Sequence, residues 1–433
     1  MDGGGGKPST GTLTAPPPSG GIRGGMAGLV LTAGGSRGAY QAGVLKRVGE
    51  IAALRGQPCP FPIITGASAG AINCAALASY GSDFGTGTAR LAQLWSQLSV
   101  TDVMRTDLPA LADNARKLVL DLSLGGAIGA GRVASLFDSS PLRRFLARHL
   151  PIEGIGEAVE RGHLRAVAIT ATGYHSGKAF TFVQGQPGLS LWTKSRRVAL
   201  ASTIGIDHVL ASSSIPLVFP PVSLSAAGAR AWFGDGALRL VTPLSPAIRL
   251  GAERLFAIGV RCQESANDLL RSELSEDAQG RELLRPPLSQ ICGVFMNAIF
   301  LDHLDADVDH LLRMNALVAA HPPTPRDRHT AVSEPMRVIT PLIVSPSDDI
   351  AIIAKTLAHR MPRGIRYLMD GLGTPDAQSA DLMSYLLFDG AYTRELIDLG
   401  YRDAHRRIDE IEAFLFDGAD AVPSPRRRRR TRH

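Results

Sequence analysis

A serine between two glycines stands directly after an apolar run, in the segment Gly66-Ala67-Ser68-Ala69-Gly70. Residues 61–65 have strand character and residues 71–77 are compatible with a helix. In a strand–turn–helix context, this G-x-S-x-G pattern strains the serine backbone and presents its Oγ as a nucleophile. Gly66 and Gly70 leave room for the neighbouring chain and for a substrate. We therefore predict that Ser68 is the nucleophile of an acyl transfer, although small-residue turns also begin ordinary helices.

A serine hydroxyl needs a base, and the candidate is Asp235 in the segment Gly234-Asp235-Gly236-Ala237. An ordinary aspartate, with a pKa of about 3.9, is a weak base. Burial beside the apolar side chains of Trp232 and Phe233 would raise this pKa towards neutral pH and favour proton transfer. An Asp-Gly pair is also common in plain turns. The serine segment favours the interpretation of Asp235 as a base.

A histidine-containing triad is the alternative, because α/β-hydrolases carry Ser, then Asp or Glu, then His along the chain. Several histidines follow Asp235, among them His303, His310, His321, His329, His359 and His405. None of them stands in a glycine-bounded turn that would project it into a site. We interpret them as surface or core residues and expect a Ser–Asp dyad.

A glycine-rich turn connects the apolar run 27–32 to a segment with helical spacing at 39–45. Backbone N–H groups in such a turn, at the start of a helix, create positive potential that can bind an oxyanion. The expected oxyanion hole consists of Gly34, Gly35, Ser36, Arg37 and Gly38. The side chain of Arg37 either adds charge there or pins the loop through an ion pair, and we favour pinning. A dinucleotide-binding turn is disfavoured, because the second strand ends at the serine segment and not at an acidic residue.

The three segments resemble, in residues and in order, the motifs of the patatin-like phospholipases, which are G-G-x-R-G, G-x-S-x-G and D-G-A or D-G-G. The matching residues are Gly34, Gly35, Arg37, Gly38, Gly66, Ser68, Gly70, Asp235, Gly236 and Ala237. Segments 136–142 and 211–221 are also similar to that family, whereas Ala33 replaces a glycine found in many members. The resemblance is good over 27–260 and looser to about 417.

This resemblance implies hydrolysis of fatty-acyl esters of phospholipids, lysophospholipids or other glycerolipids, through an acyl-serine intermediate on Ser68. The scheme requires no cofactor and no metal. The acidic segment 302–310 looks rich in ligands, but on a helix its charges spread over several faces, so we expect a solvated helix. Two alternatives remain: a thioesterase or carboxylesterase that uses the same dyad, and a non-catalytic lipid-binding scaffold. The motifs do not specify head group, acyl-chain length or oligomeric state.

The elements around these motifs alternate between strand and helix, which predicts an α/β fold of three layers, with a mostly parallel sheet covered by helices on both faces. Beyond the motifs, strands are expected at 164–170, 178–183, 254–260 and 336–344, and helices at 140–150 and 242–251. The glycine-rich stretch 125–131 is expected to form a lid or a surface loop. Segment 295–301 is expected in the core.

Composition divides the chain into four parts. Residues 1–26 are rich in Gly and Pro and are expected to be disordered, with Met26 as a possible true start. The catalytic domain is predicted at 27–345, with a helical excursion at about 264–320. A helical C-terminal region follows at 346–418, and 419–433 is expected to be a disordered arginine-rich tail.

Charge and cysteine content bear on partners and location. The formal net charge of +6 equals the charge of the six arginines at 426–430 and 432, so the rest of the chain is neutral overall. The sequence therefore predicts a lipid substrate, transient contact with a membrane surface and no specific nucleic-acid binding. No transmembrane span is expected, because the apolar stretch 63–77 is short and rich in small residues. The four dispersed cysteines fit reduced thiols in a cytoplasmic protein, with peripheral membrane contact as an option.

Overall fold

The computed structural model describes residues 25–105, 116, 135–226, 228–262, 288–300, 303–321, 336–362, 365–366 and 380–417. The predictions for residues 1–24, 125–131, 264–287 and 419–433 lie outside the described residues. Within the described ranges, a single ten-stranded sheet runs through the molecule in the order β10-β9-β1-β2-β3-β4-β6-β5, and β8 joins β3 with β7 at its far side. The strands are β1 Ala27–Leu31, β2 Ile63–Ala67, β3 Ala166–Gly173, β4 Lys178–Gly185, β5 Thr193–Lys194, β6 Arg197–Ala201, β7 Val222–Ala226, β8 Ala229–Gly234, β9 Arg254–Ile258 and β10 Thr340–Val344.

The centre of the sheet is parallel: β10, β9, β1, β2 and β3 pair in the same direction. Such strands are buried on both faces, so their sequences are almost wholly apolar. In β1 the side chains alternate between two hydrophobic clusters, with Leu29 and Leu31 in one and Val30 in the other. The two clusters lie on opposite faces of the sheet.

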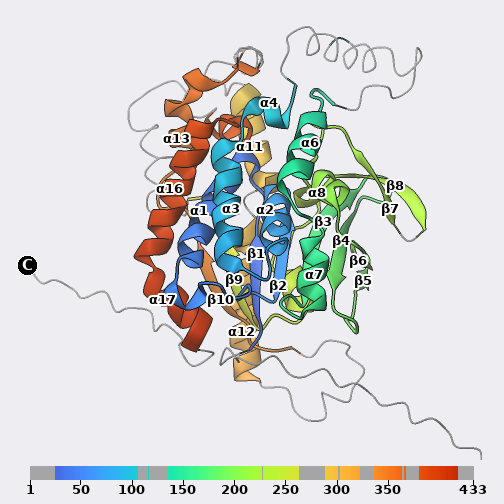
Figure 1. The fold of residues 1–433 in the computed structure, drawn as a ribbon. Coiled ribbons are helices and arrows are strands. Elements are labelled where there is room, and N and C mark those ends of the chain that lie inside the picture. Colours follow the sequence, from blue (N-terminus) through green and yellow to red (C-terminus); the bar gives the residue numbers. More distant parts are fainter. Residues whose placement is uncertain are drawn as a thin grey trace, which may run out of the picture.

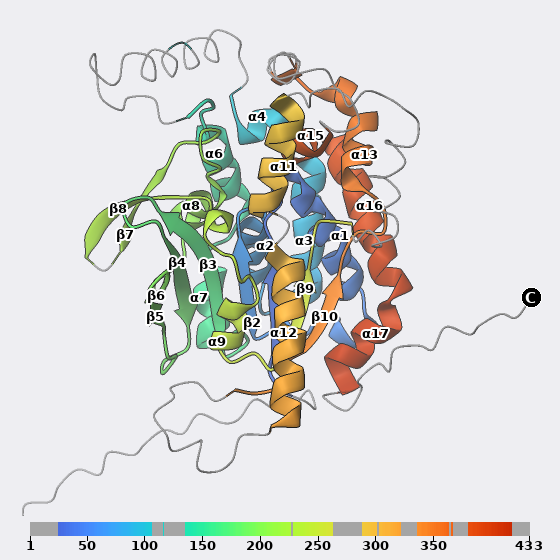
Figure 2. The ribbon, with the colours of Figure 1, turned by 180° about the vertical axis from the view of Figure 1, so that it is seen from behind.

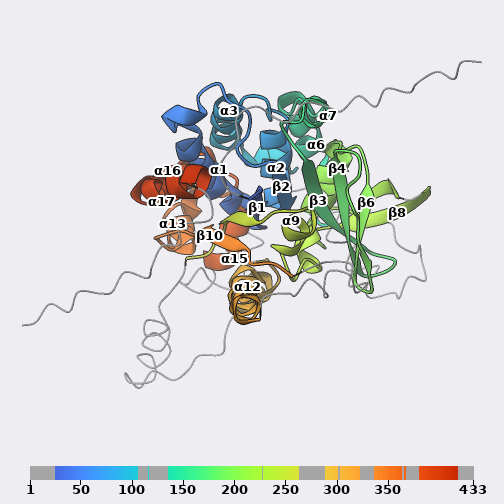
Figure 3. The same ribbon diagram turned by 90° about the horizontal axis from the view of Figure 1, so that it is seen from below.

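Helices cover both faces, which makes three layers (Figures 1, 2 and 3). Figure 1 shows α1, α2, α3 and α7 in front of the sheet, and Figure 2 shows α9, α11 and α12 in front of the other face. The helices are α1 Gly38–Gly49, α2 Ala69–Ala78, α3 Phe84–Gln97, α4 Val100–Val103, α6 Ser140–His149, α7 Gly154–Glu160, α8 Ile206–Ser213, α9 Ser245–Arg249, α11 Leu288–Phe300, α12 His303–Ala320, α13 Ile350–Thr356, α15 Ala380–Leu386, α16 Gly390–Arg406 and α17 Ile408–Glu412. The predicted fold class is confirmed.

The C-terminal helices pack directly on the first helix of the chain. A Cβ atom at Gly43 of α1 would lie 2.0 Å from the carbonyl oxygen of Ile397 in α16, and one at Gly400 would lie 2.2 Å from that of Tyr40. The two helices therefore approach closely because each carries a glycine at the contact. Residues of both segments belong to one hydrophobic cluster. The domain boundaries at 345 and 418 stay predictions.

Several elements differ from the sequence expectations. β3 runs three residues beyond the predicted end, because it continues as a hairpin with β4 up to the pair Gly173 and Lys178. The helix predicted at 242–251 is shorter: α9 spans Ser245–Arg249, with Pro246 in its first turn, where a missing N–H costs nothing. Strands β5 to β8 were not predicted. Of the described helices, none is both long and apolar enough to cross a bilayer.

The predictions for α11 and α12 are partly wrong. Phe300 is buried, but Phe295 is 63% exposed, so the described part of this segment, 295–300, is only partly in the core. In α12, expected to be solvated, Leu304 and Asp307 are buried. The Asp307 carboxylate accepts a hydrogen bond from the backbone N–H of Leu244 at 2.9 Å, which explains how a charged residue is tolerated there.

Candidate active site

Ser68 stands at the sharp turn between β2 and α2. Its backbone has φ 56° and ψ −126°, a conformation that costs a non-glycine residue about 1–3 kcal/mol. The flanking glycines are required by close packing. A Cβ atom on Gly66 would lie 2.2 Å from the carbonyl oxygen of Gly70, and a Cβ atom on Gly70 would lie 2.1 Å from the carbonyl oxygen of Leu31. The Ser68 side chain therefore sits at the end of the parallel sheet on a turn that only these small neighbours allow.

Two serines of α8 hold the Ser68 backbone in this conformation. The Ser68 N–H donates to Ser212 Oγ at 3.0 Å, and Ser212 Oγ donates to the Thr170 carbonyl at 2.6 Å. Ser213 Oγ shares its proton between the Val209 carbonyl at 2.8 Å and the Ser68 carbonyl at 3.1 Å. The sequence reasoning missed these roles. The sequence signal was the run of three serines, 212–214, between the apolar residues 209–211 and Ile215, because buried hydroxyls need hydrogen-bond partners.

Asp235 follows β8 and faces Ser68. Ser68 Oγ donates to Asp235 Oδ2 at 2.6 Å, and the Ala237 N–H donates to Asp235 Oδ1 at 2.9 Å. The Asp235 side chain is fully buried. At Gly236 a Cβ atom would lie 2.0 Å from the Thr170 carbonyl oxygen, so the residue after the aspartate has to be a glycine. The structure thus brings together the serine and aspartate that the sequence singled out.

Burial raises the pKa of Asp235 to about 7, because the charged carboxylate loses its hydration. The hydrogen bonds from Ser68 and from the Ala237 N–H act in the opposite direction and lower it. The sequence analysis attributed the raised pKa of Asp235 to burial beside Trp232 and Phe233, and this is correct for one of the two residues. Phe233 is buried, but Trp232 is 49% exposed, since alternate residues of β8 point to opposite faces.

No described histidine is hydrogen-bonded to Ser68 or to the Asp235 carboxylate, whose partners in the described ranges are Ser68 and Ala237. His303 lines a different cavity, together with Pro246 and Leu304 from the helices on the other face of the sheet. Among the described residues, no three His, Cys, Asp or Glu side chains are grouped so that they could share a metal ion.

The glycine-rich turn lies against Ser68. It forms a short 3-10 helix, η1 Gly35–Arg37, which leads into α1. Gly35 has φ +56°, a left-handed conformation that favours glycine, and it lines the same pocket as Ser68. A Cβ atom at Gly38 would lie 2.8 Å from the Trp95 ring. Tight packing on both sides therefore fixes the path of this loop.

Arg37 is buried, and its guanidinium forms an ion pair with Asp381 of α15 at 2.8 Å. These contacts agree with the expectation that Arg37 holds the loop through an ion pair, and not with the alternative that its charge is directed at the substrate.

A buried polar network that the sequence reasoning missed links the serine turn to the glycine-rich turn. Asn73 of α2 donates to the Gly38 carbonyl at 3.0 Å and to Gln41 Oε1 at 2.8 Å. The Trp95 indole N–H donates to Asn73 Oδ1 at 2.6 Å. A single asparagine in the apolar run of α2 was the available signal.

An apolar pocket opens beside Ser68. Among the described residues, Ser68 and Ser213 are those that contribute hydroxyl groups to its wall. The remaining lining residues are Gly35, Ala69, Ile72, Leu94, Trp95, Leu98, Val103, Leu142, Phe145, Leu146, Ile215, Phe219 and Phe388. A cavity of this lining suits an aliphatic chain and not a charged group.

Comparison with known proteins identifies the class. Residues 29–248, just over half of the chain, match the sequence model of the family described as patatin-like phospholipase. The chain therefore belongs to the patatin-like phospholipase family, a family of lipid acyl hydrolases, and the resemblance stated above is confirmed. No curated protein sequence matches the chain.

The chain also has a weak similarity to two solved structures. Human GIVD cytosolic phospholipase A2 is 12% identical with a TM-score of 0.38, over 91% of this chain and 60% of that chain. ExoU, from its heterodimeric complex with SpcU of the type III secretion system of Pseudomonas aeruginosa, is 14% identical with a TM-score of 0.19, over 84% and 75%. The chain thus spans about three fifths of the length of the phospholipase A2 chain.

Proposed function

We propose that this protein is a serine acyl hydrolase that cleaves fatty-acyl esters of phospholipids, lysophospholipids or other glycerolipids. One observation carries the proposal: Ser68 Oγ lies 2.6 Å from Asp235 Oδ2, both are buried, and Ser68 lines an apolar pocket. Family membership supports a lipid ester as the substrate class. The two residues supply a nucleophile and a base within hydrogen-bonding reach, which is the first requirement of nucleophilic catalysis.

In the proposed acylation step, Asp235 accepts the Ser68 proton while Oγ attacks the ester carbonyl carbon. The pKa of Asp235, raised by burial to about 7, lies close to neutral pH, where a general base is most effective. Collapse of the tetrahedral intermediate breaks the bond to the alcohol, which leaves with the proton held by Asp235. An acyl-serine remains. Water then attacks the acyl carbonyl carbon while Asp235 takes a water proton. Collapse of the second tetrahedral intermediate breaks the bond between Ser68 Oγ and the acyl carbon, Asp235 returns the proton to Oγ, and the fatty acid is released.

The negative charge on the tetrahedral intermediate needs hydrogen-bond donors that are already in place. The backbone N–H groups of Gly34 and Gly35 are the candidates. In the described part of the chain, neither is engaged by a backbone carbonyl, and Gly35 lines the Ser68 pocket. Loss of one such donor typically costs about 2.7–4 kcal/mol of transition-state stabilisation.

The pocket beside Ser68 would hold the acyl chain. Each buried methylene contributes about 0.8 kcal/mol, so contact with this apolar lining favours long-chain over short-chain esters. This preference separates the proposal from a short-chain carboxylesterase or thioesterase that uses the same residues.

We also propose that the pocket mouth meets the lipid surface at Leu217. This residue is 70% exposed although it is apolar, and its backbone has the left-handed φ of 67°, which is strained for leucine. Its neighbours Ile215 and Phe219 line the pocket. The Leu136 N–H donates to the Leu217 carbonyl at 2.8 Å, which holds the strained residue in place.

The function is tested with purified wild type, Ser68→Ala and Asp235→Ala on mixed-micelle phospholipid and on a soluble acyl ester. Ser79→Ala is the matched control. Ser79 is a buried serine at the C-terminal end of α2, the helix that follows Ser68, and its hydroxyl donates only to the Ala75 carbonyl. We expect fatty-acid release from wild type and Ser79→Ala, and background rates from the other two, with unchanged circular dichroism.

Other outcomes would decide against parts of the proposal. If Asp235→Ala keeps most of its activity, another base is at work. If wild type prefers short soluble esters or thioesters, the substrate class is wrong. If wild type binds lipid vesicles without turnover, and Ser68→Ala binds them equally, the protein is a lipid-binding scaffold.

A further inference from the structure

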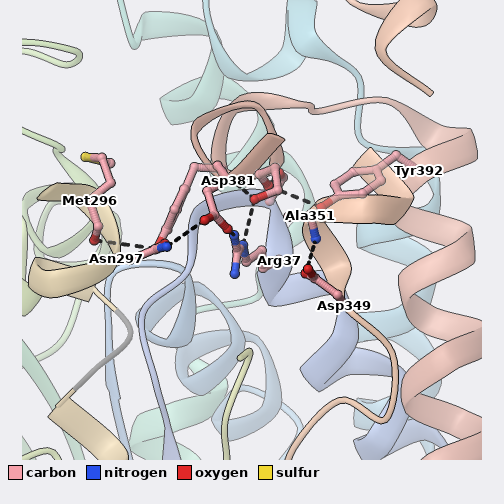
Figure 4. A network of polar contacts seen from close by, with 10 residues as sticks. Arg37, Met296, Asn297, Asp349, Ala351, Asp381 and Tyr392 are labelled. Atoms are coloured by element: carbon pink, nitrogen blue, oxygen red, sulfur yellow. Dashed lines mark hydrogen bonds and ion pairs between the residues drawn. The ribbon is translucent and has the colours of Figure 1, made fainter. Parts of the chain in front are cut away.

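The loop of the proposed oxyanion hole is held by α15, a helix more than 340 residues further along the chain (Figure 4). Ser36 Oγ donates to the Ser384 carbonyl at 2.6 Å. The Arg37 side chain donates twice, from Nε to Ser384 Oγ and from Nη2 to Asp381 Oδ1, each at 2.8 Å. Two consecutive loop residues are thus bonded to one turn of α15.

Gly35, the preceding loop residue, packs on the same turn. A Cβ atom at Gly35 would lie 2.5 Å from the Tyr385 carbonyl oxygen, so the two backbones are in direct contact. The Arg37 guanidinium carbon lies 4.7 Å from the centroid of the Tyr385 ring, in a cation–π arrangement. Main-chain packing, hydrogen bonds and an ion pair therefore all act between the loop and α15.

The carboxylate that receives Arg37 is itself fixed from a third segment. Asn297 of α11 donates to Asp381 Oδ2 at 2.8 Å, and the Tyr385 hydroxyl donates to Asn297 Oδ1 at 3.1 Å. Figure 4 shows Asp381 between Asn297 and Arg37. Because both carboxylate oxygens are bonded, the Asp381 side chain has a defined orientation, and so has the guanidinium that pairs with it.

We propose that Asp381 and Ser384 are positioning residues for the reaction, which act through Arg37 and Ser36 to hold the N–H groups of Gly34 and Gly35 where the oxyanion develops. The inference rests on the proposed function. It adds a part that the family match does not include, since the match ends at residue 248. The physical reason is that donors stabilise a transition state only when they are held in place, and a displacement of about 1 Å can cost a hundredfold in rate.

Two mild variants test this role. Asp381→Asn removes the charge but keeps an oxygen for Arg37, and Ser384→Ala removes the acceptor of Arg37 Nε while the carbonyl that binds Ser36 stays. Glu410→Gln is the control, because it breaks a different ion pair of the C-terminal region, with Arg407, away from the loop. Each rate is divided by the concentration of active sites, titrated with a long-chain fluorophosphonate that labels Ser68.

We expect kcat of Asp381→Asn and Ser384→Ala to fall about 10- to 100-fold, with KM changed by less than about twofold, because the donors act in the transition state and the pocket is formed by other residues. Inhibition by a long-chain trifluoromethyl ketone, whose serine adduct carries an oxyanion, should weaken by the same factor as kcat/KM. Inhibition by the product fatty acid should not change. Glu410→Gln should match wild type in every measurement.

Hydrogen exchange gives a readout that does not depend on activity. The backbone amides of residues 34–38 should exchange faster in both variants, while those of α3 should not change. The proposal is overturned if kcat per active site stays within twofold of wild type, or if exchange in the loop is unaltered. If wild type itself cleaves no ester, the proposed function fails, and loop exchange still decides whether α15 positions the loop.

Discussion

Ser68 and Asp235 are 167 positions apart in the sequence, yet their side chains share a hydrogen bond of 2.6 Å. Strand β3 sets this distance. Ala67, at the end of β2, pairs with Thr170 of β3, and Gly234, at the end of β8, pairs with Thr172 of the same strand. The same two threonines bind the site directly: the Thr170 carbonyl accepts from Ser212, and Thr172 Oγ1 donates to the Asp235 carbonyl at 2.8 Å. The proposed dyad is therefore fixed by the register of one central strand.

The pH dependence of the rate should follow Asp235. A general base must be ionised, and the pKa of Asp235 is raised by burial to about 7. We expect kcat/KM to rise with pH through an apparent pKa near 7, so that at pH 6 it is about a tenth of its plateau. The measurement is kcat/KM on a soluble ester from pH 5 to 9. A profile that is flat over this range would contradict the assignment.

The same pKa predicts how stability depends on pH. A carboxyl group whose pKa is higher in the folded than in the unfolded state favours folding while it is protonated, below about pH 4, and this contribution is lost as the pH rises to about 7. Asp235→Asn cannot ionise. We therefore expect this variant to gain stability relative to wild type as the pH rises from 4 to 8. Urea unfolding at several pH values measures the difference, and a constant difference would argue against a buried, raised pKa.

Much of this arrangement could be predicted from the sequence, because the motifs are local. A glycine is needed where backbone oxygens approach within about 2 Å of a Cβ position, and Gly66, Gly70 and Gly236 are such places. The alternation of apolar runs with helical spacing likewise indicates the central parallel strands. These features depend on neighbours in the chain and on sterics that hold in any protein.

The rest depends on contacts between distant segments, which spacing along one sequence does not encode. Nothing near Asp381 or Ser384 in the sequence indicates that they bind Ser36 and Arg37. The exposure of Trp232 was missed for a related reason: it lies on the short hairpin of β7 and β8, which has an open face and was not predicted. Partners across the fold become visible only when the elements are assembled.

Ser212 should matter for the rate through the Ser68 backbone. Ser212→Ala leaves the buried Ser68 N–H without its 3.0 Å acceptor, which costs about 1–3 kcal/mol, and it loosens a strained turn. We expect lower thermal stability and a kcat reduced about tenfold. Ser214→Ala is the matched control, because Ser214 Oγ donates only to the Leu210 carbonyl within its own helix. Equal effects of the two variants would show that Ser212 has no special role.

Leu217 should affect hydrolysis of assembled lipid but not of soluble ester. Leu217→Asn removes an apolar side chain that is 70% exposed, and asparagine tolerates the positive φ. We expect weaker sedimentation with phospholipid vesicles and slower hydrolysis of vesicle lipid. Ile352→Asn on α13, which replaces a residue that is 62% exposed, is the control. If both variants bind vesicles like wild type, the lipid surface is met elsewhere.

The acyl-chain preference should follow the pocket beside Ser68. Because a buried methylene contributes about 0.8 kcal/mol, kcat/KM should rise about fourfold for each added CH₂ until the cavity is full. Leu142 lines this pocket, and Leu142→Trp would occupy part of the space. In that variant the rise should stop at a shorter chain, while the rate on a butyrate ester stays close to wild type and serves as the internal control. Rates on p-nitrophenyl esters of increasing length measure both effects. If the two proteins reach their maxima at the same chain length, the acyl chain binds outside this pocket.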